Sequence, residues 1–170
     1  NNYSFITFNG TKYDVDFRIA GQPADYQMNI WLPERIPAAE TANTATIVNL
    51  FAGSSKSRVE MRIDDVQDWV SMEQFTGKDP YYEQLIKRQD TFFAKIAEAK
   101  GVKKADDKFA RKVREEFRDV LRGLPKPHDT DHLWRANLPN NLTPGSHTLV
   151  VRTTDMFGRT YSAKRMFVVH

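Results

Sequence analysis

The densest group of side chains with possible metal chemistry is the run His128-Asp129-Thr130-Asp131-His132. Imidazole and carboxylate groups are donors that zinc and manganese accept. The spacing is unfavourable, because an extended segment points the two aspartates to one side and the two histidines to the other. No helical i, i+4 arrangement is available directly after Pro127. We therefore expect a loop of turn-forming Asp and Thr, with a local hydrogen bond at His132 and no metal site.

Other catalytic and phosphate-binding motifs find little support in the chain. The absence of cysteine excludes disulfides, thiolate catalysis and Cys-ligated zinc. The Gly-x-Ser-x-Gly elbow of serine hydrolases is absent. The run Gly53-Ser54-Ser55-Lys56 lacks the second glycine before the lysine and the following helix of a phosphate-binding loop. We expect this run to be the turn between two paired strands.

Positive charge is concentrated between Lys87 and Lys126. The whole chain has a net charge of +3, from 25 Lys and Arg against 22 Asp and Glu, whereas this stretch alone has 13 against 7. Such a stretch can bind nucleic acid or anionic lipid in a salt-dependent way. Interleaved acidic residues favour instead a solvated helical surface with i, i+4 ion pairs, and no nucleic-acid partner is expected. The basic residues concerned are Lys103, Lys104, Lys108, Arg111, Lys112, Arg114, Arg118 and Arg122.

The elements that carry this charge are predicted to be two helices. Asp79, followed by a proline, is a typical N-cap, and Gly101 is expected to end the first helix. A second helix is expected from about Lys104 to Gly123. Apolar residues recur at spacings of three and four in both segments, so each helix has a face that must be covered. We therefore predict a helical-hairpin insertion at residues 79–123 that packs on itself and on the rest of the domain.

The remainder of the chain alternates between apolar and polar residues in the manner of β-strands. Asn9-Gly10 is the strongest hairpin signal, because both residues tolerate the positive φ angles of a type I′ turn. Trp134, between Leu133 and Leu138, is expected to fill the core. The pattern indicates about seven strands in one domain over residues 1–170, an antiparallel β-sandwich of immunoglobulin-like or fibronectin-like type. The strands include residues 3–8, 11–17, 26–32, 46–51, 58–63, 69–72, 147–153 and 161–169, with 46–51 paired to 58–63 and 147–153 paired to 161–169.

Motifs near the C-terminal end of the chain resemble a known family. They are His132-Leu133-Trp134, Leu138-Pro139, Pro144-Gly145-x-His147-Thr148 and Thr154-Asp155-Met156-Phe157-Gly158-Arg159-Thr160. This pattern is similar to the C-terminal domain of bacterial calcineurin-like phosphoesterases. Residues 25–30 and 59–82 resemble the family more weakly, and the middle of the chain does not. The resemblance implies that the metal-dependent hydrolase, with its divalent metals, is a separate domain preceding this chain.

The same resemblance implies that this chain is an accessory module without catalytic residues, cofactor or metal ligands. The family's metal-binding signatures are Asp-x-His, Gly-Asp, Gly-Asn-His-Asp/Glu and Gly-His-x-His, and none of them occurs here. The start at Asn1, rather than Met, agrees with our expectation of a preceding segment. The module is expected to pack on the upstream phosphoesterase domain and to position or shield its active site. The candidate contact residues are Asp155, Arg159, Lys108, Arg111, Lys112 and Arg114.

Two alternatives remain open at this stage. A Pro-Gly-x-His motif followed by Asp-x-x-Gly occurs in many immunoglobulin-like sandwiches, which favours a stand-alone adhesion or carbohydrate-binding domain. A catalytic domain is the third possibility. No apolar run approaches the ~20 residues that a membrane helix needs. We expect an extracytoplasmic location, either periplasmic or secreted.

Overall fold

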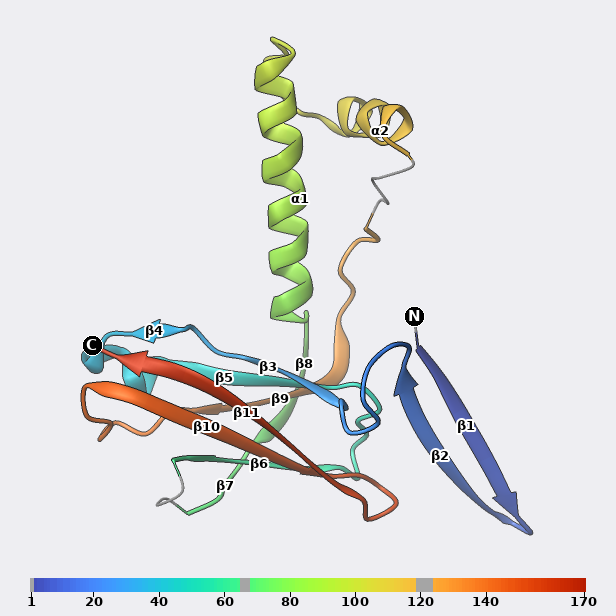
Figure 1. Ribbon diagram of the computed structural model, residues 1–170, viewed down its shortest axis with the longest axis vertical. Coiled ribbons are helices and arrows are strands. Elements are labelled where there is room, and N and C mark those ends of the chain that lie inside the picture. The colour runs from blue at the N-terminus through green and yellow to red at the C-terminus, as the bar shows by residue number, and fades with distance from the viewer. Residues whose placement is uncertain (1, 65–67, 119–123) are drawn as a thin grey trace. The chain divides into compact units, whose positions relative to one another are not determined.

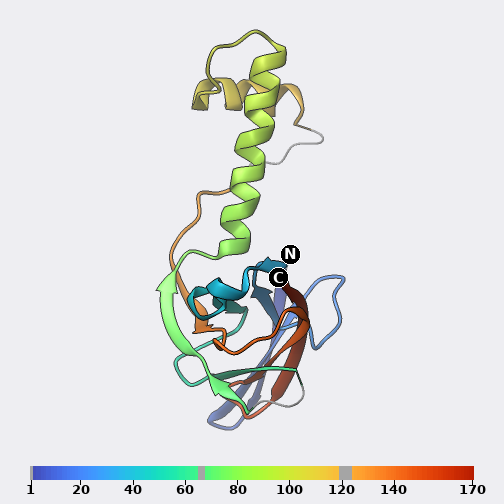
Figure 2. The ribbon, with the colours of Figure 1, turned by 90° about the vertical axis from the view of Figure 1, so that its left-hand side faces the viewer.

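The computed structural model describes residues 2–64, 68–118 and 124–170. The chain divides into two compact units, which Figures 1 and 2 distinguish as arrows and coils. The β unit comprises Asn1–Gly77 and Thr130–His170, and the helical unit comprises Lys78–Asp129. Since the helical unit lies between two strands in the sequence, it interrupts the β unit once. Across these described ranges, no helix combines the length and apolar character needed to span a membrane.

The β unit contains three sheets. All neighbouring strands are antiparallel except β4 and β11, which are parallel. A short 3₁₀ helix, η1 (Ala38–Asn43), precedes β5. The five-stranded sheet has the order β4 (Arg35–Ile36), β11 (Thr160–Val169), β10 (Gly145–Thr154), β6 (Arg58–Ile63), β7 (Val70–Ser71). The four-stranded sheet has the order β3 (Met28–Trp31), β5 (Ala45–Leu50), β9 (Thr130–Asn137), β8 (Glu73–Gly77). The third sheet is the hairpin of β1 (Asn2–Asn9) and β2 (Lys12–Ile19).

The two larger sheets share one hydrophobic core. Val48 and Trp134 come from the four-stranded sheet, and Leu149, Val151 and Phe167 come from the five-stranded sheet; all are at most 2% exposed. Inward-facing residues alternate with outward-facing ones along β5 and β10, as two sheets covering a common core require. The prediction of a mainly β, sandwich-like architecture is thus confirmed, as is the burial of Trp134.

The strand count differs from the expected seven. Eleven strands lie within the described residues. The two-residue strand β4 is too short for an alternating pattern to be visible in the sequence, whereas β7 lies within residues 69–72, where the sequence predicts a strand. Strand β8 reads Glu-Gln-Phe-Thr-Gly, in which only one residue is strongly apolar. Short and polar edge strands therefore account for part of the difference.

The predicted pairing of the strands at 46–51 and 58–63 is wrong. Strand β5 pairs with β3 and β9, whereas β6 pairs with β10 and β7 in the opposite sheet. The connection at Gly53 explains the crossing. A Cβ atom on Gly53 would lie 2.6 Å from the Trp134 ring, so the glycine lets the backbone pass directly over the core indole. The chain thus passes between sheets instead of forming a hairpin.

The N-terminal hairpin forms as predicted, but its turn is shifted by one residue. Asn9 pairs with Lys12, which leaves Gly10 and Thr11 as the two loop residues. Gly10 has φ 63°, and Asn9 is not among the described residues with positive φ. A positive φ at the first loop position alone is the type II′ arrangement, not type I′.

The helical unit contains α1 (Pro80–Ala99) and α2 (Asp107–Glu116). The start of α1 is as predicted, because the Asp79 side chain accepts a hydrogen bond from the Tyr81 N–H. Gly101 follows the helix with φ 67°. Helix α2 begins at Asp107, later than the predicted Lys104. Asp106 caps it, because its side chain accepts a hydrogen bond from the Phe109 N–H. The helix ends at Glu116, with Phe117 as its C-cap, so the predicted extension toward Gly123 is wrong. Gly123 and Arg122 themselves lie outside the described residues.

The two helices pack on each other through a small cluster. Phe93 of α1 and Ala110 and Val113 of α2 are buried there. Figures 1 and 2 both show α2 lying across α1 rather than alongside its length. The predicted mutual packing is confirmed, but the side-by-side hairpin is not, because the buried face of α2 is short.

Candidate functional site

The turn between β10 and β11 holds the first pair of candidate residues, Asp155 and Arg159. One carboxylate oxygen of Asp155 accepts hydrogen bonds from the N–H groups of Phe157 and Arg159, each at 2.9 Å. The other oxygen accepts from Arg159 Nε at 2.7 Å. Gly158 has φ 83°, the positive value that the reversal requires. The turn chemistry predicted from the sequence is therefore present.

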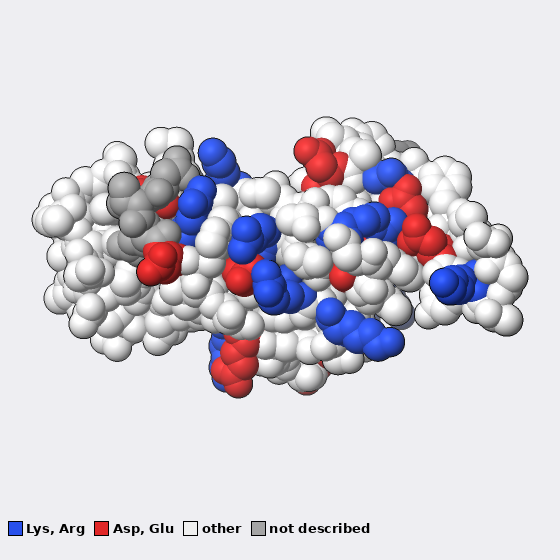
Figure 3. All heavy atoms as spheres, turned by 90° about the horizontal axis from the view of Figure 1, so that it is seen from below, with Lys and Arg blue, Asp and Glu red and all other residues white. Residues whose placement is uncertain are grey.

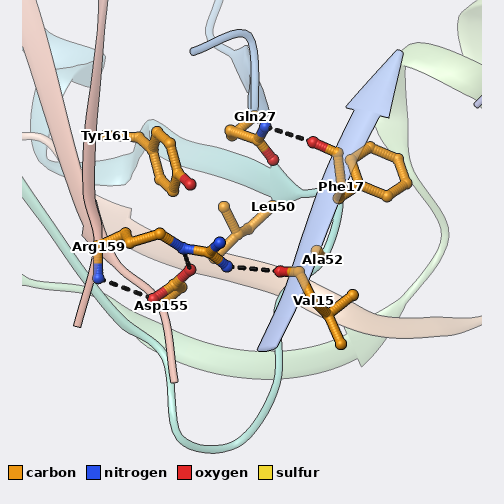
Figure 4. A pocket seen from close by; sticks show the side chains of 8 residues that line it. All are labelled: Val15, Phe17, Gln27, Leu50, Ala52, Asp155, Arg159 and Tyr161. Atoms are coloured by element: carbon orange, nitrogen blue, oxygen red, sulfur yellow. Dashed lines mark hydrogen bonds and ion pairs between the residues drawn. The ribbon is translucent and has the colours of Figure 1, made fainter. Parts of the chain in front are cut away.

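The Arg159 guanidinium extends from this turn to the N-terminal hairpin. Nη2 donates to the carbonyl oxygen of Val15 at 2.6 Å, and Nη1 lies 3.2 Å from Asp14 Oδ1. Figure 4 shows Arg159 between Asp155 and Val15. Burial tends to lower the pKa of Arg159, but the bond to Asp155 and the surrounding negative charges raise it overall, so the group stays cationic. This pair therefore ties β2 to the closing turn.

The hollow beside this joint is too small for a substrate. It is bounded in part by Phe17, Gln27 and Tyr161 (Figure 4) and has a volume of about 20 Å³. Such a space accommodates about one water molecule. Buried Gln27 donates from Nε2 to the carbonyl oxygens of Phe17 at 2.9 Å and Ala24 at 2.8 Å. The residues around the hollow thus join the hairpin to the sandwich.

A second polar cluster, which the sequence did not reveal, joins Asp64 to His147. His147 is 8% exposed, and its Nδ1 lies 2.9 Å from Asp64 Oδ2 while its Nε2 lies 2.7 Å from the carbonyl oxygen of Thr143. The other oxygen of Asp64 accepts from the Thr148 N–H at 2.8 Å. Since both ring nitrogens face acceptors, the geometry favours the doubly protonated imidazolium.

The pKa values of this cluster move in the directions that such contacts dictate. The Thr143 carbonyl is the main cause that raises the pKa of His147; burial opposes it and Asp64 reinforces it. Burial works to raise the pKa of Asp64, but the hydrogen bonds from Thr148 and His147 lower it overall. The cluster fixes the start of β10 against the end of β6 and has no open coordination site.

The remaining candidate residues lie on α2, in the other unit. Lys108, Arg111 and Lys112 are exposed. Arg111 has one long contact with Glu115, at 3.9 Å between largely exposed side chains, which contributes little to stability. The Arg114 guanidinium lies 5.0 Å from the centre of the Phe93 ring. The expected i, i+4 pairing is therefore weak, and most of this positive charge faces solvent.

The His128–His132 run leads into a strand of the four-stranded sheet. Thr130, Asp131 and His132 begin β9 instead of forming the expected loop. The His132 N–H donates to Thr130 Oγ1 at 3.2 Å, so its local hydrogen bond is as predicted. No group of three or more His, Cys, Asp or Glu suited to a metal ion occurs in residues 2–64, 68–118 and 124–170.

Charged side chains on the outer face of the five-stranded sheet are paired with one another. Glu60 of β6 lies 2.9 Å from Arg152 of β10 and 3.1 Å from Arg58. The Arg152 guanidinium lies 4.1 Å from the centre of the Trp69 ring. Figure 3 shows basic and acidic groups intermingled on the face that it displays. Where its residues are described, this face therefore combines both signs of charge.

Comparison with known proteins identifies the family. A family model described as the C terminal of calcineurin-like phosphoesterase matches residues 1–111 and 96–161. Searches of curated proteins and of solved structures give no match. The family match covers most of the chain and includes the β10–β11 turn with Asp155 and Arg159. The chain therefore belongs to the family formed by the C-terminal part of calcineurin-like phosphoesterases.

Proposed function

We propose that this chain is a non-catalytic accessory module that packs on the upstream phosphoesterase domain of the same polypeptide and helps to position or shield its active site. The family match carries this proposal, because a C-terminal part of a phosphoesterase implies a catalytic domain before it. The absence of the Asp-x-His, Gly-Asp, Gly-Asn-His-Asp/Glu and Gly-His-x-His signatures from the sequence supports a non-catalytic role.

The divalent metals of the parent enzyme belong, in this proposal, to the upstream domain. The chemistry of the donor groups supports this assignment. Asp155 is occupied by three hydrogen-bond donors, and His147 and Asp64 bind each other and the backbone. Carboxylate and imidazole groups committed to such contacts are poorly placed to bind a metal.

The six candidate contact residues divide into two roles under this proposal. Asp155 and Arg159 act indirectly, because their polar atoms bind the turn and β2. Lys108, Arg111, Lys112 and Arg114 form a cationic surface on α2. Such a surface raises the local concentration of anionic substrates at a phosphoesterase site in a salt-dependent way. We propose that the first pair orients the module and that the second group interacts with the substrate's charge.

The experiment compares the two-domain polypeptide with the same polypeptide lacking residues 1–170. We expect the truncated enzyme to retain its metal content by elemental analysis, because the metal ligands remain. We also expect kcat/KM for a phosphoester substrate to fall and the thermal transition of the catalytic domain to move to lower temperature. Unchanged kcat/KM together with an unchanged transition would contradict the proposal.

A further inference from the structure

The N-terminal hairpin is attached to the β unit through only one of its two strands. Its ladder runs from Asn2 paired with Ile19 to Asn9 paired with Lys12. Every residue of β1 is exposed, whereas β2 is partly buried from Val15 to Ile19. Within the described residues, β1 has no neighbouring strand other than β2. The outer edge of β1 is thus unpaired, a feature that proteins usually cover.

Strand β2 is fixed by hydrogen bonds and by aromatic contacts at several residues along its length. Val15 accepts from Arg159, and Phe17 accepts from Gln27, through their carbonyl oxygens. The Phe17 ring lies 6.1 Å from that of Phe51, centre to centre, and Tyr13 lies 6.1 Å from Phe157 at a steep angle. These contacts hold β2 in a defined orientation. They also direct β1 away from the core.

One face of the hairpin is apolar toward its turn. The register places Ile6 opposite Val15 and Phe8 opposite Tyr13, so these four side chains share a face. Ile6 is 57% exposed, Phe8 74% and Tyr13 52%. The opposite face combines exposed aromatic residues of β1 with the charged residues of β2. Those residues are Tyr3 and Phe5, and Lys12, Asp14, Asp16 and Arg18.

This exposure is unusual for a surface strand. Single exposed apolar residues are common, but contiguous apolar patches mark interaction sites. Strand β1 also has no charged residue to discourage pairing with another chain, since it reads Asn-Tyr-Ser-Phe-Ile-Thr-Phe-Asn. An exposed, uncharged strand with a free edge therefore favours a covering partner.

We propose that the β1–β2 hairpin is the docking element of this module, and that the upstream catalytic domain buries the row formed by Ile6, Phe8 and Tyr13. This inference rests on the proposed function. The family description places the matched region, which includes β1 and β2, in the C-terminal part of a phosphoesterase, so the catalytic domain precedes the hairpin in the polypeptide. A domain joined to the hairpin through the same polypeptide has a raised effective concentration there. Because the exposed row is apolar, the matching surface on the catalytic domain is apolar as well.

The experiment is hydroxyl-radical footprinting of the two-domain polypeptide at several protein concentrations. Met166 of β11, which is 70% exposed, is the internal reference for an accessible side chain. Labelling at Phe8 and Tyr13, normalised for intrinsic reactivity, is expected to be at least fivefold below that reference at every concentration. The double variant Ile6→Ser, Phe8→Ser is expected to restore Tyr13 labelling, whereas the control Val70→Ser, at an exposed residue of β7, leaves it unchanged.

The possible outcomes separate this inference from the proposed function. Full labelling of Phe8 and Tyr13, with protection elsewhere in residues 1–170, would overturn the inference and leave the packing proposal intact. If every residue of 1–170 is labelled as strongly as its exposure in this structure allows, both the inference and the packing proposal are overturned. Protection that disappears on dilution would assign the covering surface to a second copy of the chain and would also overturn the inference. The wild-type footprint decides between these results even if the double variant fails to fold.

Discussion

The two hairpins of the β unit have similar local structure and opposite environments. The N-terminal hairpin pairs β1 with β2, and the closing hairpin pairs β10 with β11, both in long antiparallel ladders. Strand β10 has neighbours on both sides, and its Leu149 and Val151 are completely buried. Strand β1 has one neighbour, and its Phe8 is 74% exposed. Strand pairing therefore does not determine burial, which depends on what lies across each face.

The two hairpins are also linked asymmetrically. The turn of the closing hairpin supplies Arg159, which binds the β2 backbone. Among the described residues, Gly10 and Thr11 of the β1–β2 turn are not part of the hydrophobic core. The closing hairpin thus acts as the base and the N-terminal hairpin as the attached element. This arrangement suits a rigid core that presents an interaction surface.

The largest expected contrast comes from the same substitution in each hairpin. Phe167→Ala in β11 removes a ring that is 2% exposed and stacks on His147, and it should lower the free energy of unfolding by about 3–5 kcal/mol. Phe8→Ala in β1 should change it by less than ~0.5 kcal/mol, because the ring is largely in solvent. Urea unfolding of the chain measures both values. Equal losses would show that the exposed hairpin contributes to the core.

Breaking the link between the hairpins should have an intermediate effect. Arg159→Met keeps the aliphatic part of the side chain but leaves the Val15 carbonyl and the Asp155 carboxylate without this donor. A loss of about 1–2 kcal/mol is expected, together with faster amide exchange in β2 than in β10. Arg111→Met on exposed α2 is the matched control and should change neither quantity. Unaltered β2 exchange in Arg159→Met would mean that the aromatic contacts and the Gln27 bond to Phe17 suffice to hold the hairpin.

The closing hairpin should respond to pH through His147 and Asp64, whereas the N-terminal hairpin contains no histidine. The pKa of His147 is raised above 6.5, so its stabilising contribution is complete below pH 6.5 and is lost as the pH rises through the folded-state pKa. The pKa of Asp64 is lowered below 3.8, so its contribution is present above pH 3.8 and is lost as the pH falls through the folded-state value.

The pair should therefore contribute most between about pH 3.8 and 6.5, the two unperturbed pKa values. Unfolding free energies measured through this range and beyond it should decline above about pH 6.5. The variant His147→Gln should remove this decline. His132→Gln, at a more exposed histidine, is the control and should keep the decline. A decline that persists in His147→Gln would assign the pH dependence to other groups.

The smallest effect is expected from the charge on α2. Changing Lys108, Arg111, Lys112 and Arg114 to Gln together should lower kcat/KM of the two-domain enzyme by a few-fold at low salt. The difference should shrink at ~0.15 M salt, where screening acts over about 8 Å. Lys87→Gln with Lys95→Gln on α1 is a control for loss of positive charge. Equal kcat/KM at both ionic strengths would remove α2 from the proposed function and leave the docking hairpin unaffected.

Much of the local structure was predictable because it depends on neighbouring residues. Asp79 followed by proline predicts the start of α1, and Asp155 with Gly158 predicts the closing turn, since each motif satisfies backbone groups within a few residues. Trp134 between two leucines predicts a buried side chain. The turn at Gly10 was displaced by one residue, because the ladder that includes Asn9 and Lys12 selects the register.

The partners of the site residues were not predictable from spacing. Arg159 and Val15 are 144 residues apart, and His147 and Asp64 are 83 apart, so no local pattern links either pair. Strands β5 and β6 are adjacent in sequence, but each buries alternate side chains, and that pattern is satisfied equally by a hairpin or by two facing sheets.

The sequence by itself thus determined most of the segments that become strands and helices, where several of them begin, and which family the motifs resemble, because these properties follow from local hydrogen bonding, side-chain periodicity and residue identity. Only the tertiary structure decided that β5 and β6 lie in different sheets, that Arg159 holds β2, and that Phe8 is exposed while Phe167 is buried. An alternating strand has the same pattern whether its apolar face meets the core of its own domain or the surface of a partner.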